Sequence, residues 1–132
     1  MTMCPESGSD HEFSAMRVLL VEDSYFAAVD VQRKLEQLGC RVVGPVPSLR
    51  EGLELASRES ITAAILDINI LGGSSAEIAE LLLSRGVPFF FISGYTSPSC
   101  LPERLKNLTK VQKPVHAQVL AATVRREFLH SA

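Results

Sequence analysis

Five short apolar runs alternate along the chain with segments in which apolar residues recur every three or four positions. The apolar runs are Val18–Val21, Val42–Val43, Ala63–Leu66, Pro88–Ile92 and a weaker run, Lys110–Gln112. Continuous apolar runs of this length are typical of strands that are buried on both faces of a parallel sheet. The pattern therefore predicts five strands that belong to one sheet.

The segments between the runs carry helix signals. Apolar spacing predicts helices near residues 24–39, 48–56, 75–86 and 115–129. Ser24 is a suitable N-cap for the first helix, and Gly39 is a suitable residue for its C-terminal end. Two prolines, Pro98 and Pro102, interrupt the segment between the last two strands, so we expect a short or irregular fourth helix there. In the last helix we expect one buried stripe, formed by Val115, Val119, Ala122 and Leu129.

Strands and helices that alternate over this length predict an α/β fold. The expected architecture is a doubly wound, five-stranded parallel sheet with helices on both faces and right-handed crossovers. Residues 1–15 are polar and show no hydrophobic period, so we expect them to be a flexible leader. Residues 16–130 are expected to form a single domain.

Composition and charge exclude several classes of function. The formal net charge of -2 gives no long-range attraction to nucleic acid or to an anionic membrane. No apolar run approaches the roughly 20 residues that cross a bilayer, and the first residues do not resemble a secretion signal. We therefore expect a soluble cytoplasmic protein without membrane insertion or direct nucleic-acid binding. The sequence distances between Cys4, Cys40 and Cys100 do not match those of a metal site, so we interpret these residues as ordinary thiols.

Polar residues follow four of the five predicted strands, where a doubly wound sheet places its ligand site. They are Glu22, Asp23, Asp67, Ser93 and Lys113. Three neighbouring carboxylates would raise one another's pKa unless a hard cation such as Mg²⁺ lay among them. With Mg²⁺ present, a positioned carboxylate could attack phosphorus in line. Lys113 and Ser93 could then donate hydrogen bonds to phosphoryl oxygens.

The ordered set Glu22-Asp23, Asp67, Ser93 and Lys113-Pro114 resembles the response-regulator receiver family, over roughly residues 17–129. The resemblance implies a flavodoxin-like receiver fold with Asp67 as the phospho-acceptor. It implies that Mg²⁺ is held by Glu22, Asp23, Asp67 and the backbone carbonyl of Asn69. Ser93 and Lys113 would sense the phosphoryl group.

The resemblance also implies a role in bacterial two-component or phosphorelay signalling. The phosphoryl donor would be a sensor histidine kinase or a phosphotransfer protein. The protein would be a phospho-accepting signalling domain that assists its own phosphorylation and dephosphorylation, rather than an enzyme. Because the chain ends soon after the last predicted helix, we expect it to act through a protein partner, as a phosphoryl sink, relay or effector, and to be a monomer or weak dimer.

A narrower likeness lies in residues 88–95, which resemble the P-F-x-F-A-T-G-Y signature of the FATGUY subgroup of single-domain receivers. That subgroup is associated with kinases of the HWE and HisKA2 types and with stress signalling. Lys110 occupies the position where receivers usually carry a switch Tyr or Phe, so Tyr95 is our hypothesis for the substitute aromatic. Pro114 is interpreted as a cis proline that orients Lys113.

Alternative functions remain open at this stage. A small phosphatase with Asp67 as nucleophile would resemble haloacid-dehalogenase-like enzymes, but Asn69 stands where those enzymes need a second acid. A flavin-binding module of similar topology would need a phosphate loop where Glu22 and Asp23 stand. The remaining alternative is a docking protein that keeps the fold without being phosphorylated.

Overall fold

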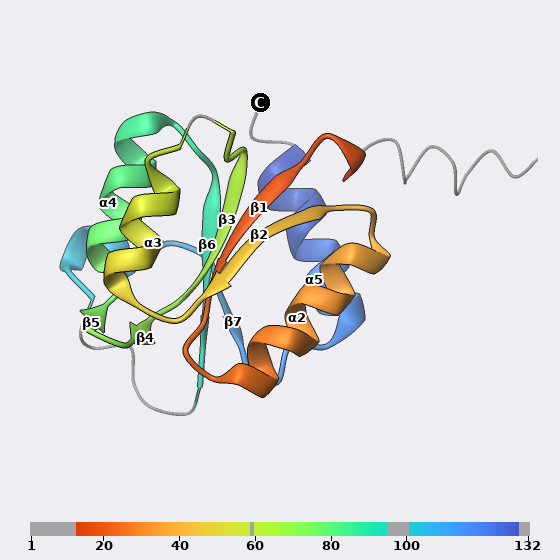
Figure 1. Ribbon diagram of the computed structural model, residues 1–132, viewed down its shortest axis with the longest axis horizontal. Helices are drawn as coiled ribbons and strands as arrows, with labels where there is room; N and C mark the ends of the chain where they lie inside the picture. The colour runs from red at the N-terminus through yellow and green to blue at the C-terminus, as the bar shows by residue number, and fades with distance from the viewer. Residues whose placement is uncertain (1–12, 59, 95–100, 130–132) are drawn as a thin grey trace, which may run out of the picture.

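A five-stranded parallel sheet forms the centre of the computed structural model, which describes residues 13–58, 60–94 and 101–129 (Figure 1). The strand order is β2-β1-β3-β6-β7, and each neighbouring pair is parallel. The strands are β1 (Arg17–Val21), β2 (Arg41–Val46), β3 (Ala63–Asp67), β6 (Phe89–Ser93) and β7 (Lys110–Gln112). Strand β2 lies on one side of β1, whereas β3, β6 and β7 follow on its other side, so the order of the strands reverses between β1 and β3. The predicted fold class is confirmed.

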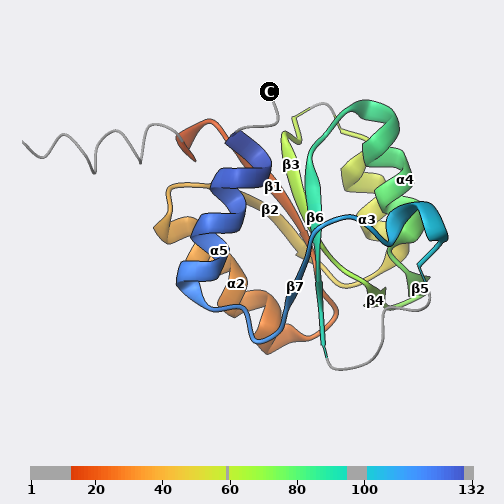
Figure 2. The same ribbon diagram turned by 180° about the vertical axis from the view of Figure 1, so that it is seen from behind.

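Helices cover both faces of this sheet. The helices are α2 (Tyr25–Gln37), α3 (Leu49–Ala56), α4 (Ala76–Arg85) and α5 (Ala117–Val124), which a π-helical turn, η2 (Arg125–Leu129), extends. Helices α2 and α5 lie on one face, and α3 and α4 lie on the other (Figures 1 and 2). None of the helices in the described residues is long and apolar enough to cross a bilayer.

Two smaller elements complete the described chain. A short hairpin, β4 (Asn69–Ile70) and β5 (Gly73–Ser74), follows β3 directly. The expected irregular fourth helix contains one 3₁₀ turn, η1 (Glu103–Leu105), among the described residues. Between residues 101 and 109 the chain forms no α-helix, in agreement with the prediction of a short or irregular fourth helix, and Pro98 lies outside the described residues.

The apolar runs are continuous because successive side chains of one strand enter different cores. In β1, Val18 and Leu20 belong to the core under α2 and α5, whereas Leu19 and Val21 belong to the core under α3 and α4. All four side chains are completely buried. The aromatic run of β6 divides in the same way. A strand covered on both faces cannot place a polar residue at alternate positions without burying it.

The predicted buried stripe of the last helix is confirmed at Val115, which is buried, and at Leu129, which packs against the core, but it was wrong at Val119 and Ala122. Val119 is 45% exposed and Ala122 is also exposed, whereas Leu120 and Val124 are fully buried. Phe128 continues the buried stripe and stacks on Phe90 with ring centroids 5.4 Å apart. This segment is apolar on almost every side, so its sequence is compatible with more than one stripe. The position of the helix against the sheet selected one of them.

Packing against the sheet begins within the expected leader. Phe13 is 1% exposed and belongs to the core under α2 and α5, and the guanidinium of Arg125 lies 5.4 Å from the centre of its ring. Residues 1–12 lie outside the described part of the chain. The folded unit therefore includes residues 13–15, which precede the expected domain boundary at residue 16.

Gly52 lies at a close contact between α3 and α4 and provides a test of this packing. A Cβ atom at position 52 would lie 2.5 Å from Cδ1 of Ile78, whose side chain is fully buried, and 3.3 Å from Cγ2 of Val21. We expect Gly52→Ala to lower the free energy of unfolding by about 1–2 kcal/mol. The destabilisation from overpacking should exceed the stabilisation from the higher helix propensity of alanine. Urea denaturation measures this loss.

The control for this substitution is Ile78→Val, which removes the crowded Cδ1 atom. In the Ile78→Val background, Gly52→Ala should cost clearly less than in the wild type. The same loss in both backgrounds would show that the contact with Ile78 is not the cause.

Candidate functional site

Acidic residues from two neighbouring strands meet at one edge of the sheet. Glu22 and Asp23 directly follow β1, and Asp67 is the last residue of β3. The two strands pair in register, with Val21 opposite Leu66, so their carboxyl ends lie side by side. This edge lies where the order of the strands reverses, which is where a doubly wound sheet offers a ligand site.

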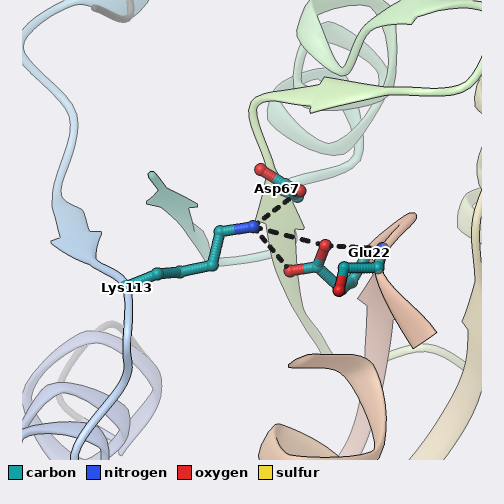
Figure 3. A network of polar contacts seen from close by, with 4 residues as sticks. Glu22, Asp67 and Lys113 are labelled. Carbon is teal, nitrogen blue, oxygen red and sulfur yellow. Dashed lines mark hydrogen bonds and ion pairs between the residues drawn. The ribbon is translucent and has the colours of Figure 1, made fainter. Parts of the chain in front are cut away.

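Lys113 reaches this acidic edge from the segment after β7 (Figure 3). Its Nζ atom lies 3.1 Å from Oδ2 of Asp67 and 3.0 and 3.3 Å from the two carboxylate oxygens of Glu22. The backbone N–H of Ser24 donates a further hydrogen bond, 2.9 Å long, to Oε2 of Glu22. One ammonium group therefore bridges two carboxylates that come from different strands.

The buried position of Asp67 changes its acidity. Asp67 is 4% exposed, and its surroundings raise the pKa of its carboxyl group to about 7. Burial is the largest cause, the hydrogen bond and the charge of Glu22 also raise the pKa, and the hydrogen bond and the charge of Lys113 lower it. An ionised Asp67 therefore depends on compensation by positive charge.

Lys113 responds to the same neighbours. Burial by itself would lower the pKa of its ammonium, but the hydrogen bonds and charges of Glu22 and Asp67 outweigh that effect, so the pKa of Lys113 is raised. Lys113 is therefore a permanent cation in this site at neutral pH.

The acidic residues have the composition and spacing of a site for a hard cation. Glu22, Asp23 and Asp67 each offer a carboxylate oxygen, and these oxygens lie within 4.8 Å of one another. Glu22 and Asp67 are buried, whereas Asp23 is exposed and faces solvent. Oxygen ligands of this kind suit Mg²⁺, which keeps several waters when few carboxylates bind it.

The structure places the other predicted site residues near this edge. Ser93 ends β6, and its carbonyl accepts a 2.7 Å hydrogen bond from the N–H of Lys113. The peptide bond between Lys113 and Pro114 is cis, an isomer that the sequence allowed but did not decide. Asn69 begins β4, two residues after Asp67. The proposed roles of the Ser93 hydroxyl and of the Asn69 carbonyl stay predictions, and Tyr95 lies outside the described residues.

Two lysines have contacts that the sequence analysis missed. The ammonium of Lys110 donates to the backbone carbonyls of Lys106 and Leu108, so this residue stabilises the end of the segment around η1. The ammonium of Lys34 donates to Asp30 at 2.7 Å and to the carbonyl of Val115 at 2.6 Å. The spacing of Asp30 and Lys34 suggests the first of these contacts. No sequence signal indicates a bond between residues 81 positions apart.

Comparison with solved structures gives closely similar folds. The solution structure of SdrG from Sphingomonas melonis Fr1 is 32% identical, with a TM-score of 0.74, and the match covers 90% of this chain and 98% of SdrG. A second solution structure shows the BeF₃-activated conformation of SdrG, with 30% identity, 85% and 94% coverage and a TM-score of 0.68. A response regulator receiver protein from Sinorhizobium medicae WSM419 shares the fold, with 19% identity, a TM-score of 0.77 and coverage of 89% and 97%.

Among curated proteins, the chain is similar to the phyllosphere-induced regulator PhyR of Methylorubrum extorquens. The two are 29% identical over 113 residues, which make up 83% of this chain. The match covers 42% of the length of PhyR, so this chain spans less than half of that longer protein. No family model matches the chain.

Proposed function

This chain belongs to the response-regulator receiver family, and on that premise we propose that Asp67 accepts a phosphoryl group in a reaction that requires Mg²⁺. Membership of the family supports a role in signalling. The donor, the metal and the downstream partner are parts of the proposal. A histidine kinase, or a phosphotransfer protein that it phosphorylates, is the proposed donor.

The observation that carries the proposal is the contact of Lys113 with Asp67, 3.1 Å long, at a carboxylate that lies beside two other acids. Lys113 and a divalent cation can keep Asp67 ionised and therefore nucleophilic. An oxygen of Asp67 forms a bond to phosphorus, the bond between phosphorus and the donor's imidazole nitrogen breaks, and the imidazole keeps the electron pair. The product is an acyl phosphate on Asp67.

The acidic edge fits a magnesium ion through its donor set. Asp23 and Asp67, with Glu22 directly or through water, would hold the ion, and the carbonyl of Asn69 is the further ligand that the family resemblance implies. When bound, Mg²⁺ neutralises the charge of the incoming phosphoryl oxygens. Lys113 can follow the transferred group, because its flexible stem lets the ammonium pair with a phosphoryl oxygen after pairing with Asp67.

The BeF₃-activated conformation of SdrG supports the proposal. That structure is of a protein 30% identical to this chain, in a conformation activated by BeF₃. We extend this behaviour to the present chain, so BeF₃⁻ is expected to bind at Asp67 and to shift the structure. Ser93 and Lys113 are the residues proposed to report the bound group, and Tyr95 is the aromatic proposed to move with them.

The deciding experiment measures phosphoryl uptake by intact mass. Wild-type protein and Asp67→Asn are incubated with acetyl phosphate, with and without Mg²⁺. We expect a single phosphoryl addition to the wild type that requires Mg²⁺ and is absent from Asp67→Asn. If the wild type takes up no group from acetyl phosphate or from candidate kinases, an unphosphorylated docking role replaces the proposal.

The same samples test whether the chain is instead a phosphatase. We propose that it is not an enzyme acting on outside substrates, because Asn69 cannot serve as the general acid that repeated turnover needs. The chain would assist only its own phosphorylation and dephosphorylation. Sustained release of phosphate from several equivalents of a small phosphoester would contradict this part of the proposal.

Asp23 offers a separate test of the metal. Because its carboxylate is exposed, we expect Asp23→Asn to change the metal-free free energy of unfolding by no more than about 0.5 kcal/mol. Mg²⁺ should stabilise the wild type against urea, because it binds the folded state, and this gain should be largely lost in Asp23→Asn. Glu103→Gln, at another exposed carboxylate, is the control and should keep the full gain. An unchanged gain in Asp23→Asn would remove Asp23 from the metal site.

The cellular setting follows from the subgroup resemblance and is part of the proposal. Similarity of residues 88–95 to the FATGUY signature favours a kinase of the HWE or HisKA2 type and a role in stress signalling. Phosphorylation by a purified HWE or HisKA2 kinase, but not by a kinase of another type, is the expected result.

A further inference from the structure

The segment from Lys113 to His116 has no regular secondary structure, although it presents the cation of the site. Two backbone contacts connect it to β6 and α2, in addition to the hydrogen bond from the N–H of Leu120 to the carbonyl of His116 at the start of α5. The N–H of Lys113 donates to the carbonyl of Ser93 at 2.7 Å, and the carbonyl of Val115 accepts from Lys34 at 2.6 Å. The first contact connects the segment to β6, and the second connects it to α2.

Lys34 is held in place on its own helix. Its ammonium also donates to Asp30, one turn earlier, at 2.7 Å, and its side chain is 23% exposed. Charged hydrogen bonds with these lengths are stronger than neutral ones. Lys34 therefore forms a two-sided bridge, with a carboxylate on one side and a backbone carbonyl on the other.

Packing leaves space between the two elements that this bridge connects. A hollow of about 320 Å³ is lined by Ala27, Asp30 and Val31 of α2 and by Gly94, Lys113, Pro114 and Val115. Figures 1 and 2 both show the segment after β7 passing beside α2. The side chains of Val31 and Val115 are buried in the same core, so packing holds the side chain of Val115, and the bridge of Lys34 adds a restraint on its backbone carbonyl beside this space.

We propose that Lys34 is a positioning residue for Lys113. By holding the carbonyl of Val115 against α2, it fixes the segment from which the ammonium of Lys113 reaches Asp67 and Glu22. The inference rests on the proposed function in one respect, because its kinetic test uses phosphoryl transfer to Asp67. The simpler role for Lys34 is a helix-surface pair with Asp30, which would affect helix stability and leave the site unchanged.

The first test compares Lys34→Met with Arg33→Met. Arg33 is a neighbouring cation that also pairs with Asp30, at 3.7 Å, and its side chain is 66% exposed. We expect Lys34→Met to slow phosphorylation by acetyl phosphate about tenfold, the factor that corresponds to one charged hydrogen bond. Arg33→Met should retain the wild-type rate. Equal rates for Lys34→Met and wild type, or equal slowing in both variants, would overturn the proposal.

The second test repeats Lys34→Met in a Lys113→Met background. If Lys34 acts through Lys113, its removal should cause no further slowing once the ammonium of Lys113 is absent. A tenfold loss in both backgrounds would show a general structural effect and overturn the proposal. Lys34→Arg, which keeps a charged donor, is expected to recover most of the rate. If Lys34→Met does not fold, Lys34→Gln carries the same comparison.

Hydrogen exchange provides a readout that does not depend on phosphorylation. The amide of Lys113 should exchange about tenfold faster in Lys34→Met, relative to amides of β3, because its segment has lost one restraint. Unchanged protection of Lys113 would contradict a positioning role. If the wild type takes up no phosphoryl group, the proposed function fails, but this measurement still decides whether Lys34 positions Lys113.

Discussion

Lys113→Met is expected to lower the free energy of unfolding by about 2–4 kcal/mol at pH 8 without divalent cations. Removing one partner of a buried ion pair leaves an uncompensated charge and costs about 3–5 kcal/mol. Lys113 is 23% exposed in its side chain, so we place the loss below the upper end of that range. Urea denaturation in the presence of a chelator measures it.

This loss should depend on pH, because Asp67 can neutralise itself by binding a proton. Its folded pKa is already about 7, and removal of Lys113 takes away an interaction that lowers it. At pH 6 a protonated Asp67 needs no cation, so the loss should be clearly smaller than at pH 8.

The double variant Asp67→Asn with Lys113→Met provides the control. Asparagine removes one of the two charges that Lys113 compensates, so Lys113→Met should cost less in this background than in the wild type. The same cost in both backgrounds would show that the lysine stabilises the fold through packing of its stem rather than through its charge.

Asp67→Asn, in contrast, is expected to raise the free energy of unfolding at pH 8 by about 2–4 kcal/mol when no divalent cation is present. The pKa of Asp67 is about 7 in the folded protein against an ordinary value of 3.8, and one pKa unit corresponds to about 1.4 kcal/mol. Because the folded state binds the proton more tightly, stability falls as pH rises from about 4 to about 7. Asparagine has no such cost.

The pH profile is the decisive measurement for this prediction. The difference between Asp67→Asn and wild type should be small near pH 4, should grow up to about pH 7 and should then level off. Asp23→Asn, at an exposed acid of the same site, should show a much weaker change. A constant difference across the range would indicate that burial of Asp67 does not oppose its ionisation.

The two predictions together imply that the buried acids lower the free energy of unfolding of the metal-free protein, although the proposed reaction requires them. Burial and the charge of Glu22 oppose ionisation of Asp67 in the metal-free protein, and under the proposed function Mg²⁺ and Lys113 would compensate the charge of Asp67 and leave it able to attack phosphorus. Natural proteins commonly accept such a cost at functional sites. Mg²⁺ should therefore stabilise the wild type more than Asp67→Asn.

The sequence by itself determined the strands, their order along the chain and the residues at the sheet edge. Strands buried on both faces must be apolar throughout, so Val18–Val21 and the aromatic run before Ser93 could be recognised without knowing their neighbours. Glu22, Asp23 and Asp67 could be grouped because parallel strands bring their carboxyl ends to one edge. The same reasoning placed Lys113 at this edge.

The tertiary structure decided what depends on the relative placement of elements. The buried stripe of α5, the packing of Phe13 and the bridge from Lys34 to Val115 all join parts of the chain that have no local relation. The bidentate contact of Lys113 with Glu22, and the raised pKa of Asp67, likewise follow from burial and distance rather than from residue type. Local pattern determines which residues must be buried, but only the packed sheet and helices determine which of them meet.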